Sequence, residues 1–260
     1  MEERPTEFVQ SLERGLGVIK AFDGDHPALT LSEVAARSGL TRAAARRFLI
    51  TLEILGYVRS QDRRFSLRPA VLELAHSYLS SMNLPEIAMP HLELLAAQVE
   101  AASSISVLDR RDIVYVARVA TKKIMAVNIN VGTRFPAAAT SMGRAILAFL
   151  PAGELEEQLR DLRLEARTPF TITKMKPLRA ELDRVRGQGY CLLDQELEVG
   201  LRALAAPIRD TSGYPVAAIN VSIPLLAQSV EEIIDNFLEP VLGRVAAIEQ
   251  DLKATGFVRS

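Results

Sequence analysis

Apolar positions at helical spacing dominate the first part of the chain. Leu12, Leu16, Ile19 and Phe22 recur every three or four residues, which predicts a helix from about Phe8 to Phe22. The segment "DGDHPA" that follows contains glycine, proline and three charged or polar residues, so the helix should end there.

Two further helices follow, separated by a tight turn. In "TLSEVAARSG", Thr30 and Glu33 have the spacing of a capping box, and Gly39 is the residue type expected just after a helix C-terminus. Thr41 is a new N-cap, and the apolar spacing predicts a third helix that runs to Leu55. This is the pattern of a helix-turn-helix.

The third helix has two different faces. The apolar positions predicted to face the core are Ala45, Phe48, Leu49, Leu52 and Leu55. The outward positions in its first two turns are then Arg42, Ala43, Arg46 and Arg47. Arginine donates paired hydrogen bonds to guanine or phosphate, and alanine lets a helix backbone approach DNA closely. Together with the cap Thr41, these residues are predicted to enter a major groove.

A basic hairpin follows the third helix in "GYVRSQDRRFSLRP". Two short strands, 57–59 and 64–67, are predicted around a polar turn, with Arg63 and Arg64 at its tip. A helix-turn-helix followed by such a hairpin is typical of a winged helix-turn-helix, and we expect both arginines to contact duplex DNA.

Charge is unevenly placed along the chain. The whole sequence has a formal net charge of −1, but residues 37–68 hold eight arginines against Glu53 and Asp62. A solvated arginine-rich surface would explain the charge alone, whereas the capped helices and the hairpin favour DNA. RNA is a weaker interpretation, because Phe48 and Phe65 are predicted in the core and only 5% of residues are aromatic.

Composition limits the remaining possibilities. The chain has 260 residues, 48% of them hydrophobic, which suits a folded protein of two domains. Its single cysteine and its charged N-terminus predict a cytoplasmic protein, and no apolar run is long enough to predict a membrane span. We expect a DNA-binding domain at 1–68, a linker helix at 69–84 and a second domain at 85–260.

The second domain is predicted to be α+β, with an antiparallel sheet. A proline-containing helix at 86–102 precedes two strands joined by the turn "DRRD" at 109–112. A strand at 123–131, a loop at 132–139 and a helix at 140–150 come next. Two helices, at 153–162 and 176–188, precede strands within 189–196, 200–210 and 214–224, and a long helix at 229–252 follows. Strands grouped in hairpins with helices at the edges indicate an α+β sensor domain.

Catalytic, metal and cofactor signatures are missing from the sequence. The histidines His26, His76 and His91 have no second ligand at metal-binding spacing. Cys191 lies in an apolar segment with no basic neighbour, which favours a buried structural thiol over a nucleophile. An enzyme or a pure interaction module remains the distant alternative, and turnover or redox sensitivity that depends on Cys191 would favour it.

Several long motifs carry a resemblance that covers nearly the whole chain. The segments "FVQSLERGLGVIKAF", "LTLSEVAARSGLTRAAARRFLITLEILGYV", "GTRFPAAATSMGRAILA" and "GLRALAAPIRD" resemble the IclR family of bacterial transcription regulators. Within it, "SLERGL", "TRAAARRFL" and "VGTRFPAAATSMGR" are most similar to the protocatechuate and 4-hydroxybenzoate regulators of the β-ketoadipate pathway. The resemblance implies a winged helix for DNA, a GAF-like domain for a small effector, and dimers that pair into tetramers.

The resemblance also implies an effector pocket at the start of the "TSMGRA" helix and on the facing sheet. Its residues would be Thr140, Ser141, Met142, Leu193, Asp194, Leu201, Ala203, Asn220 and Ser222. Relatives have a polar or thiol residue at Ala203, and the glyoxylate-responsive branch has an acidic residue at Leu193. A more apolar pocket fits an aromatic ring better than a two-carbon acid.

Arg134 is a candidate ligand for the effector's carboxylate. Its loop leads into the helix that begins near Thr140, and Phe135 and Met142 could contact an aromatic ring. The alternative is a surface arginine, or one that pairs with an acidic residue of a partner subunit.

The resemblance therefore implies a regulator of aromatic-acid catabolism, often an activator, whose effector would be protocatechuate, 4-hydroxybenzoate or a related acid. A repressor that responds to a small aliphatic carboxylate is the near alternative. A two-fold dimer would bind a duplex operator with an inverted repeat, its half-sites about 34 Å or a multiple apart.

Overall fold

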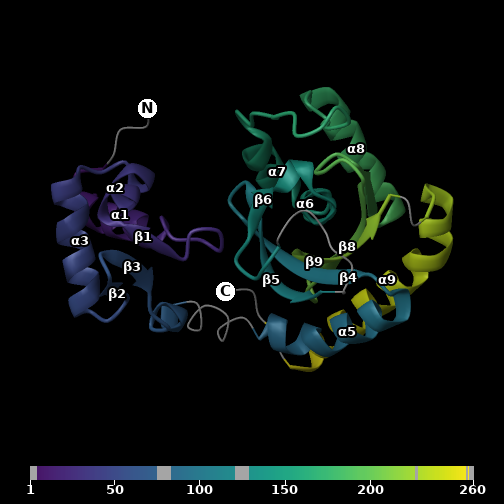
Figure 1. The fold of residues 1–260 in the computed structure, drawn as a ribbon. Coiled ribbons are helices and arrows are strands. Elements are labelled where there is room, and N and C mark those ends of the chain that lie inside the picture. The colour runs from purple at the N-terminus through teal and green to yellow at the C-terminus, as the bar shows by residue number, and fades with distance from the viewer. Residues whose placement is uncertain (1–4, 75–82, 121–128, 226–227, 256, 258–260) are drawn as a thin grey trace. The chain divides into compact units, whose positions relative to one another are not determined.

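The computed structural model describes residues 5–74, 83–120, 129–225, 228–255 and 257. The chain forms two compact units, Met1–Ser81 and Met82–Ser260, which are described separately below (Figure 1). Residues 71–74 are helical, and 75–82 lie outside the described residues, so most of the predicted linker helix is not described.

The N-terminal unit is a winged helix-turn-helix. Its elements are α1 (Gln10–Ile19), β1 (Ala28–Thr30), α2 (Leu31–Ser38), α3 (Arg42–Ile54), β2 (Val58–Gln61) and β3 (Arg64–Leu67). The capping box of Thr30 and Glu33 is confirmed, and Gly39 adopts the left-handed conformation with φ 66°. Thr41 caps α3 by accepting a hydrogen bond from the backbone N–H of Ala44.

Strand β1 was not predicted from the sequence. Only three residues long, it pairs with β3, and the sheet order is β1-β3-β2. So short a strand has no alternating pattern of its own, because only Leu29 is buried in it. It forms because β3 already offers a hydrogen-bonding edge.

Leu55, expected in the core, is instead exposed, and so are two residues of the predicted apolar stripe of the first helix. Leu12 and Leu16 are 62% and 44% exposed, and Leu55 is 61% exposed. Helix α1 contributes Val18 to the core, followed by Phe22 in the turn after the helix. Only the C-terminal end of α1 therefore packs into this core, and an apolar stripe is left on its N-terminal turns.

The C-terminal unit is α+β, as predicted. Its helices are α5 (Leu84–Val99), α6 (Ser141–Leu147), α7 (Ala152–Leu159), α8 (Met175–Gln188) and α9 (Val230–Ala254), with a 3₁₀ turn η1 (Ala137–Ala139). Its strands are β4 (Ala102–Asp109), β5 (Asp112–Val119), β6 (Arg134–Pro136), β7 (Cys191–Asp194), β8 (Leu201–Arg209) and β9 (Pro215–Pro224). The described strands form one antiparallel sheet in the order β6-β5-β4-β9-β8-β7.

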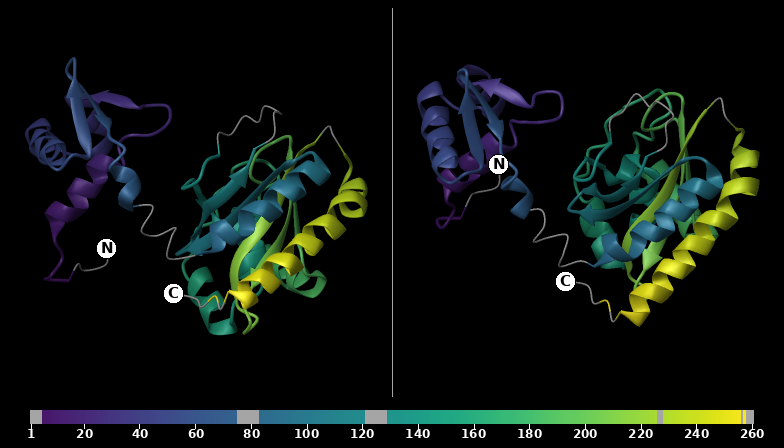
Figure 2. Two further views of the ribbon diagram at one scale, coloured as in Figure 1. Left: turned by 90° about the horizontal axis from the view of Figure 1, so that it is seen from below. Right: turned by 60° about the horizontal axis from the view of Figure 1, so that its bottom comes forward.

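Helices cover both faces of this curled sheet (Figures 1 and 2). The long helices α5 and α9 pack side by side on one face. Helix α6 lies against the other face, in contact with β8 and β9. The 132–139 segment, expected as a loop, includes strand β6, because 134–136 pair with β5. The predicted strand at 123–131 lies largely outside the described residues.

Helix α6 is completely buried within this unit. All seven of its residues are buried. A Cβ at Gly143 would lie 2.1 Å from the carbonyl oxygen of Ala137, so the backbones of α6 and η1 touch at a point where only glycine fits. Of the helices in the described segments, none has both the length and the apolar character needed to cross a membrane.

Candidate nucleic-acid interface and ligand cavity

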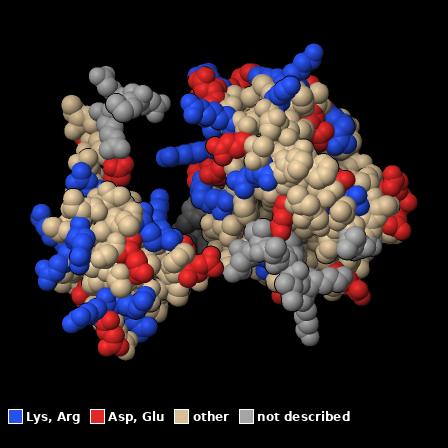
Figure 3. Space-filling model, turned by 45° about the horizontal axis from the view of Figure 1, so that its top comes forward, with Lys and Arg blue, Asp and Glu red and all other residues tan. Residues whose placement is uncertain are grey.

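The first turns of α3 present free arginines. Thr41, Arg42, Ala43, Arg46 and Arg47 are all exposed, as the sequence predicts. The guanidinium groups of Arg42, Arg46 and Arg47 have no hydrogen bond or ion pair with any residue that the structure describes. Figure 3 shows Lys and Arg side chains at several places on the surface of the N-terminal unit. These cations are available to a polyanion.

The hairpin between β2 and β3 holds its two arginines differently. Gln61 pairs with Arg64, so Asp62 and Arg63 form a two-residue turn, and both have positive φ (51° and 63°). The side chain of Arg63 has no partner among the described residues. Arg64 instead donates Nη1 to the carbonyl oxygen of Ala28 at 3.1 Å. Arg63 is free to reach a phosphate, whereas Arg64 holds the wing to β1.

A small cavity lies between α6 and the sheet of the C-terminal unit. Its volume is about 20 Å³, and it is lined by Tyr115, Ile129, Thr140, Ser141, Met142, Leu193, Leu197, Leu201, Ala203, Asn220 and Ser222. The start of α6 supplies three of these residues, while β5, β7, β8 and β9 supply most of the others. The structure thus brings together eight residues from the expected effector pocket: Thr140, Ser141, Met142, Leu193, Leu201, Ala203, Asn220 and Ser222.

Among the described residues that line the cavity, the polar side chains carry no formal charge. Asn220 is 3% exposed, and its Nδ2 donates to Ser222 Oγ at 3.4 Å, but its Oδ1 has no partner among the described residues. Burial raises the pKa of the Tyr115 hydroxyl to about 12, so this phenol stays protonated at neutral pH. The cavity therefore offers an unused acceptor beside hydroxyl groups. Such a lining suits a ligand with its own hydroxyl or carboxyl group.

Arg134 does not line this cavity. Its Nη1 is 2.6 Å from Asp109 Oδ2 and its Nε is 3.3 Å from Asp112 Oδ2, and the side chain is 42% exposed. Hydrogen bonds from these two carboxylates raise the pKa of its guanidinium. The expectation that Arg134 reaches the start of α6 is corrected here: pairing of β6 with β5 places it beside two acidic residues of its own chain.

Two other expected ligands also lie outside the cavity lining. The ring of Phe135 meets that of Tyr115 edge to face, with centroids 6.0 Å apart, so Phe135 supports a lining residue from behind. Asp194 Oδ1 accepts a hydrogen bond from Arg202 Nε at 2.9 Å. Successive residues of a strand point to opposite faces of the sheet. Because the side chain of Leu193 lines the cavity, that of the next residue, Asp194, points away from it.

Sequence reasoning missed three lining residues, Tyr115, Ile129 and Leu197. The alternation of "DIVYVARV" could have placed Tyr115 on one face of β5, but not in a cavity. Leu197 lies in the segment 195–200 between β7 and β8, which has no periodic pattern. No local signal would have found it.

A buried ion pair lies next to this cavity. Arg144, on α6, is 1% exposed and donates to both carboxylate oxygens of Glu196, each at 2.6 Å. Its Nε donates to the carbonyl oxygen of Ala138 at 2.8 Å. Glu196 Oε2 also accepts from the backbone N–H of Ile172, and its carbonyl oxygen accepts from Thr171 Oγ1 at 2.7 Å. Each of the three guanidinium nitrogens thus donates at least one hydrogen bond, as a buried charge requires.

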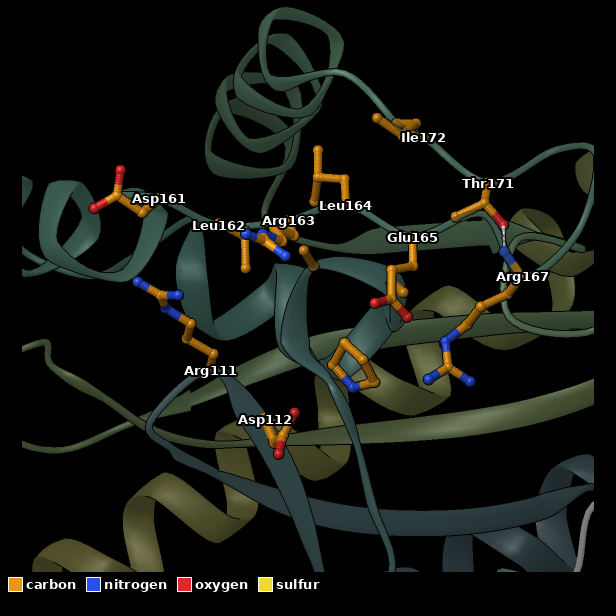
Figure 4. A pocket seen from close by; sticks show the side chains of 13 residues that line it. Arg111, Asp112, Asp161, Leu162, Arg163, Leu164, Glu165, Arg167, Thr171 and Ile172 are labelled. Atoms are coloured by element: carbon orange, nitrogen blue, oxygen red, sulfur yellow. Dashed lines mark hydrogen bonds between the residues drawn. The ribbon is translucent and has the colours of Figure 1, made fainter. Parts of the chain in front are cut away.

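A larger, open pocket lies beyond this ion pair (Figure 4). It measures about 340 Å³, and its lining includes Ala138, Thr171 and Ile172, which are all partners of Arg144 or Glu196. Figure 4 shows Arg111 and Asp161 on one side and Arg167 on the other, where the backbone N–H of Arg167 donates to Thr171. Its charged side chains are of both signs, so they favour no single ligand charge.

Comparison with known protein families identifies the family to which both units belong. The IclR helix-turn-helix domain matches residues 11–62, and the family described as "Bacterial transcriptional regulator IclR C-terminal" matches residues 76–250. The chain belongs to the IclR family. The predicted resemblance is confirmed, and so is the two-part fold.

Individual IclR-family relatives point to aromatic-acid catabolism. The Pca regulon regulatory protein of Pseudomonas putida is 44% identical over 237 residues, which is 91% of this chain and 81% of the relative. The p-hydroxybenzoate hydroxylase transcriptional activator of Acinetobacter baylyi is 36% identical, over 94% of this chain and 92% of the relative. An IclR homologue from Microbacterium hydrocarbonoxydans, solved in complex with 4-hydroxybenzoate, superposes with a TM-score of 0.82 at 27% identity, covering 94% and 100% of the two chains.

The chain is therefore a ligand-responsive IclR-type transcriptional regulator, similar to regulators of aromatic catabolism, and it is not an enzyme. Cys191 fits this conclusion. It is fully buried, and desolvation raises the pKa of its thiol to about 12, so the reactive thiolate is scarce at neutral pH. Among the described residues, no three His, Cys, Asp or Glu side chains are grouped so as to hold a metal ion.

Proposed function

We propose that this regulator binds a hydroxylated aromatic acid, 4-hydroxybenzoate or protocatechuate, in the cavity between α6 and the sheet. The observation that carries the proposal is the buried, unpartnered Oδ1 of Asn220, in a cavity that Tyr115 also lines. A phenolic hydroxyl of the ligand would donate to Asn220, and Met142, Leu193 and Leu201 would contact its ring. The relative solved with 4-hydroxybenzoate supports this choice.

The ligand's carboxylate would be held by neutral donors, since none of the described residues that line the cavity has a charged side chain. Thr140, Ser141 and Ser222 each place a hydroxyl in the lining. Hydrogen bonds to a charged acceptor contribute about 1.5–3 kcal/mol each, which makes a set of neutral donors sufficient for one carboxylate. A small oxo acid such as pyruvate has no hydroxyl to donate to Asn220, and it would contact less of the apolar lining than an aromatic ring does.

Asn220→Ala tests this assignment. We expect the affinity for 4-hydroxybenzoate to fall about 5- to 10-fold, or about 1 kcal/mol, because one hydrogen bond is lost. The affinity for benzoate should change less than 2-fold, since benzoate has no hydroxyl to donate. Isothermal titration calorimetry measures both.

Arg134→Ala is the matched control for that titration. It removes an exposed guanidinium whose partners are Asp109 and Asp112, so binding of both acids should stay at the wild-type level. A loss of affinity in Arg134→Ala, with Asn220→Ala unaffected, would contradict the proposed cavity. Tight binding of glyoxylate or pyruvate, and of no aromatic acid, would instead favour the aliphatic alternative.

We propose further that α3 and the wing bind duplex DNA through Thr41, Arg42, Ala43, Arg46, Arg47 and Arg63, with Arg64 mainly holding the wing. Arg63→Ala should weaken binding to all duplexes alike and lower the slope of log K against log salt by about 0.9, the value for one phosphate contact. Arg64→Ala should change this slope less, because its guanidinium already donates to Ala28. Fluorescence anisotropy over a salt series measures both slopes, and equal slopes in the two variants would reject the distinction.

A homodimer or a dimer of dimers is proposed for the assembly. The supporting observation is the exposed apolar stripe of α1, where Val9, Leu12 and Leu16 are 58%, 62% and 44% exposed. A two-fold dimer would bind an operator with an inverted repeat. Leu12→Asp should shift the protein toward monomers in analytical ultracentrifugation, and an unchanged mass would place the interface elsewhere.

Activation of aromatic-catabolism genes is the proposed outcome of binding, and in a bacterium this takes place in the cytoplasm. The relative described as a p-hydroxybenzoate hydroxylase transcriptional activator supports this direction of control. A reporter under the regulated promoter should rise when 4-hydroxybenzoate is added, and a reporter that is high only in the absence of the protein would show a repressor.

A further inference from the structure

The empty cavity is too small for the ligand proposed above. It measures about 20 Å³, whereas an apolar cavity that binds benzene measures about 150 Å³. Binding of any aromatic acid therefore requires part of the lining to move. How each part of the lining is held shows which part can move.

Most of the lining is fixed by regular structure. Ala203, Asn220 and Ser222 lie in the continuous ladder of β8 and β9. Ser141 and Met142 lie in α6, which cannot move toward η1 because Gly143 already touches Ala137. These residues form the rigid floor and wall.

Leu197 lies outside helices and strands, in residues 195–200, which we name the lid. Within the lid, the backbone N–H of Gly200 donates to Gln195 Oε1 at 3.2 Å, and that of Leu201 donates to Glu198 O. The lid has no ladder to the sheet between β7 and β8. These bonds are local. At its C-terminal end the lid is also tied to the end of β9, because the backbone N–H of Leu225 donates to the carbonyl oxygen of Gly200 at 2.7 Å.

Glu196 ties the N-terminal part of the lid to the rest of the unit. Its carboxylate is held by the guanidinium of Arg144 and by the backbone N–H of Ile172, and its carbonyl oxygen by Thr171 Oγ1. The adjoining residue, Leu197, lines the cavity. The anchor of the lid is thus one residue away from the side chain that covers the cavity.

We infer that Arg144 is a positioning residue for effector binding, and that its ion pair with Glu196 latches the lid over the cavity. The ligand enters when this latch opens and Leu197 moves away. The inference rests on the proposed function, because it concerns the same cavity. It assigns a role to two residues that do not themselves line the cavity.

Glu196→Gln tests the latch in the ligand-free protein. Loss of the negative charge weakens the hold of Arg144 while keeping the size of the side chain. Hydrogen exchange followed by mass spectrometry should become at least 10-fold faster at 196–201 and at the Ile172 amide, with α8 unchanged. Glu156→Gln is the matched control, because it breaks an exposed pair with Arg179 and should leave exchange at the lid as in the wild type.

The rate of ligand association distinguishes a latch from an ion pair that only stabilises the fold. The association rate constant for 4-hydroxybenzoate should rise about 5- to 10-fold in Glu196→Gln, whereas simple damage to the fold would lower binding without speeding entry. Leu197→Ala keeps the ion pair intact and should also increase the association rate constant. It therefore provides an independent test if the Glu196→Gln variant does not fold. Unchanged exchange at the lid, or unchanged association rates in both variants, would overturn the latch. If the wild type binds no aromatic acid, the proposed ligand is wrong, and the exchange experiment still decides the latch.

Discussion

Gly143→Ala should destabilise the C-terminal unit by about 3 kcal/mol or more. The added methyl would lie 2.1 Å from the carbonyl oxygen and 2.4 Å from the Cα of Ala137, and both are backbone atoms that cannot swing aside. Overpacking a rigid core costs about 1–3 kcal/mol and occasionally more, and here α6 must separate from η1. Urea unfolding followed by circular dichroism measures the change.

Gly187→Ala is the control for that measurement. Gly187 lies within α8, its added methyl would meet nothing within 4 Å, and its φ is not positive. Alanine there should stabilise the helix by about 0.5–1 kcal/mol. Equal stability of Gly143→Ala and the wild type would mean that α6 and η1 are not in contact in solution.

Arg46→Glu should reduce affinity for an operator, selected from random duplexes, by about 100-fold or more. One lost base contact costs about 1–3 kcal/mol, and the new carboxylate would also face the phosphates. Arg42→Glu should act similarly, since both arginines are exposed on the first turns of α3 and neither has a partner among the described residues. The fold should persist, because no ion pair is broken.

Arg163→Glu is the matched charge reversal in the other unit. Arg163 is also exposed, and it lines the open pocket, far along the chain from the helix-turn-helix. Anisotropy with the same operator should give wild-type affinity for this variant. Equal losses in Arg46→Glu and Arg163→Glu would indicate a general charge effect and would reject α3 as the recognition helix.

The sequence predicted those parts of the fold that short-range chemistry determines. Thr30 with Glu33, and Gly39, mark the ends of α2 because a cap involves residues only three or four apart. Eight residues that line the cavity were anticipated through the family resemblance and not through periodicity, because a cavity joins segments far apart in the chain.

Long-range pairing explains what was missed. Arg134 was assigned to the effector because its neighbours in sequence are uncharged, but β5 brings Asp109 and Asp112 to it. Glu196 is 52 residues from Arg144 in the sequence, and no local pattern around either residue predicts their ion pair. Strand β1 likewise exists only because β3 lies beside it.

The small size of the empty cavity has a consequence for how the regulator responds in the cell. When only a fraction of molecules is open, the apparent dissociation constant is the intrinsic one divided by that fraction. A protein that is open about 1% of the time would need about 100-fold more effector for half-saturation. Substitutions at Thr171 or Glu196, which do not line the cavity, would then tune the effector concentration at which the regulator responds. They would change the threshold of the response while leaving the choice of effector, and the operator, as they are.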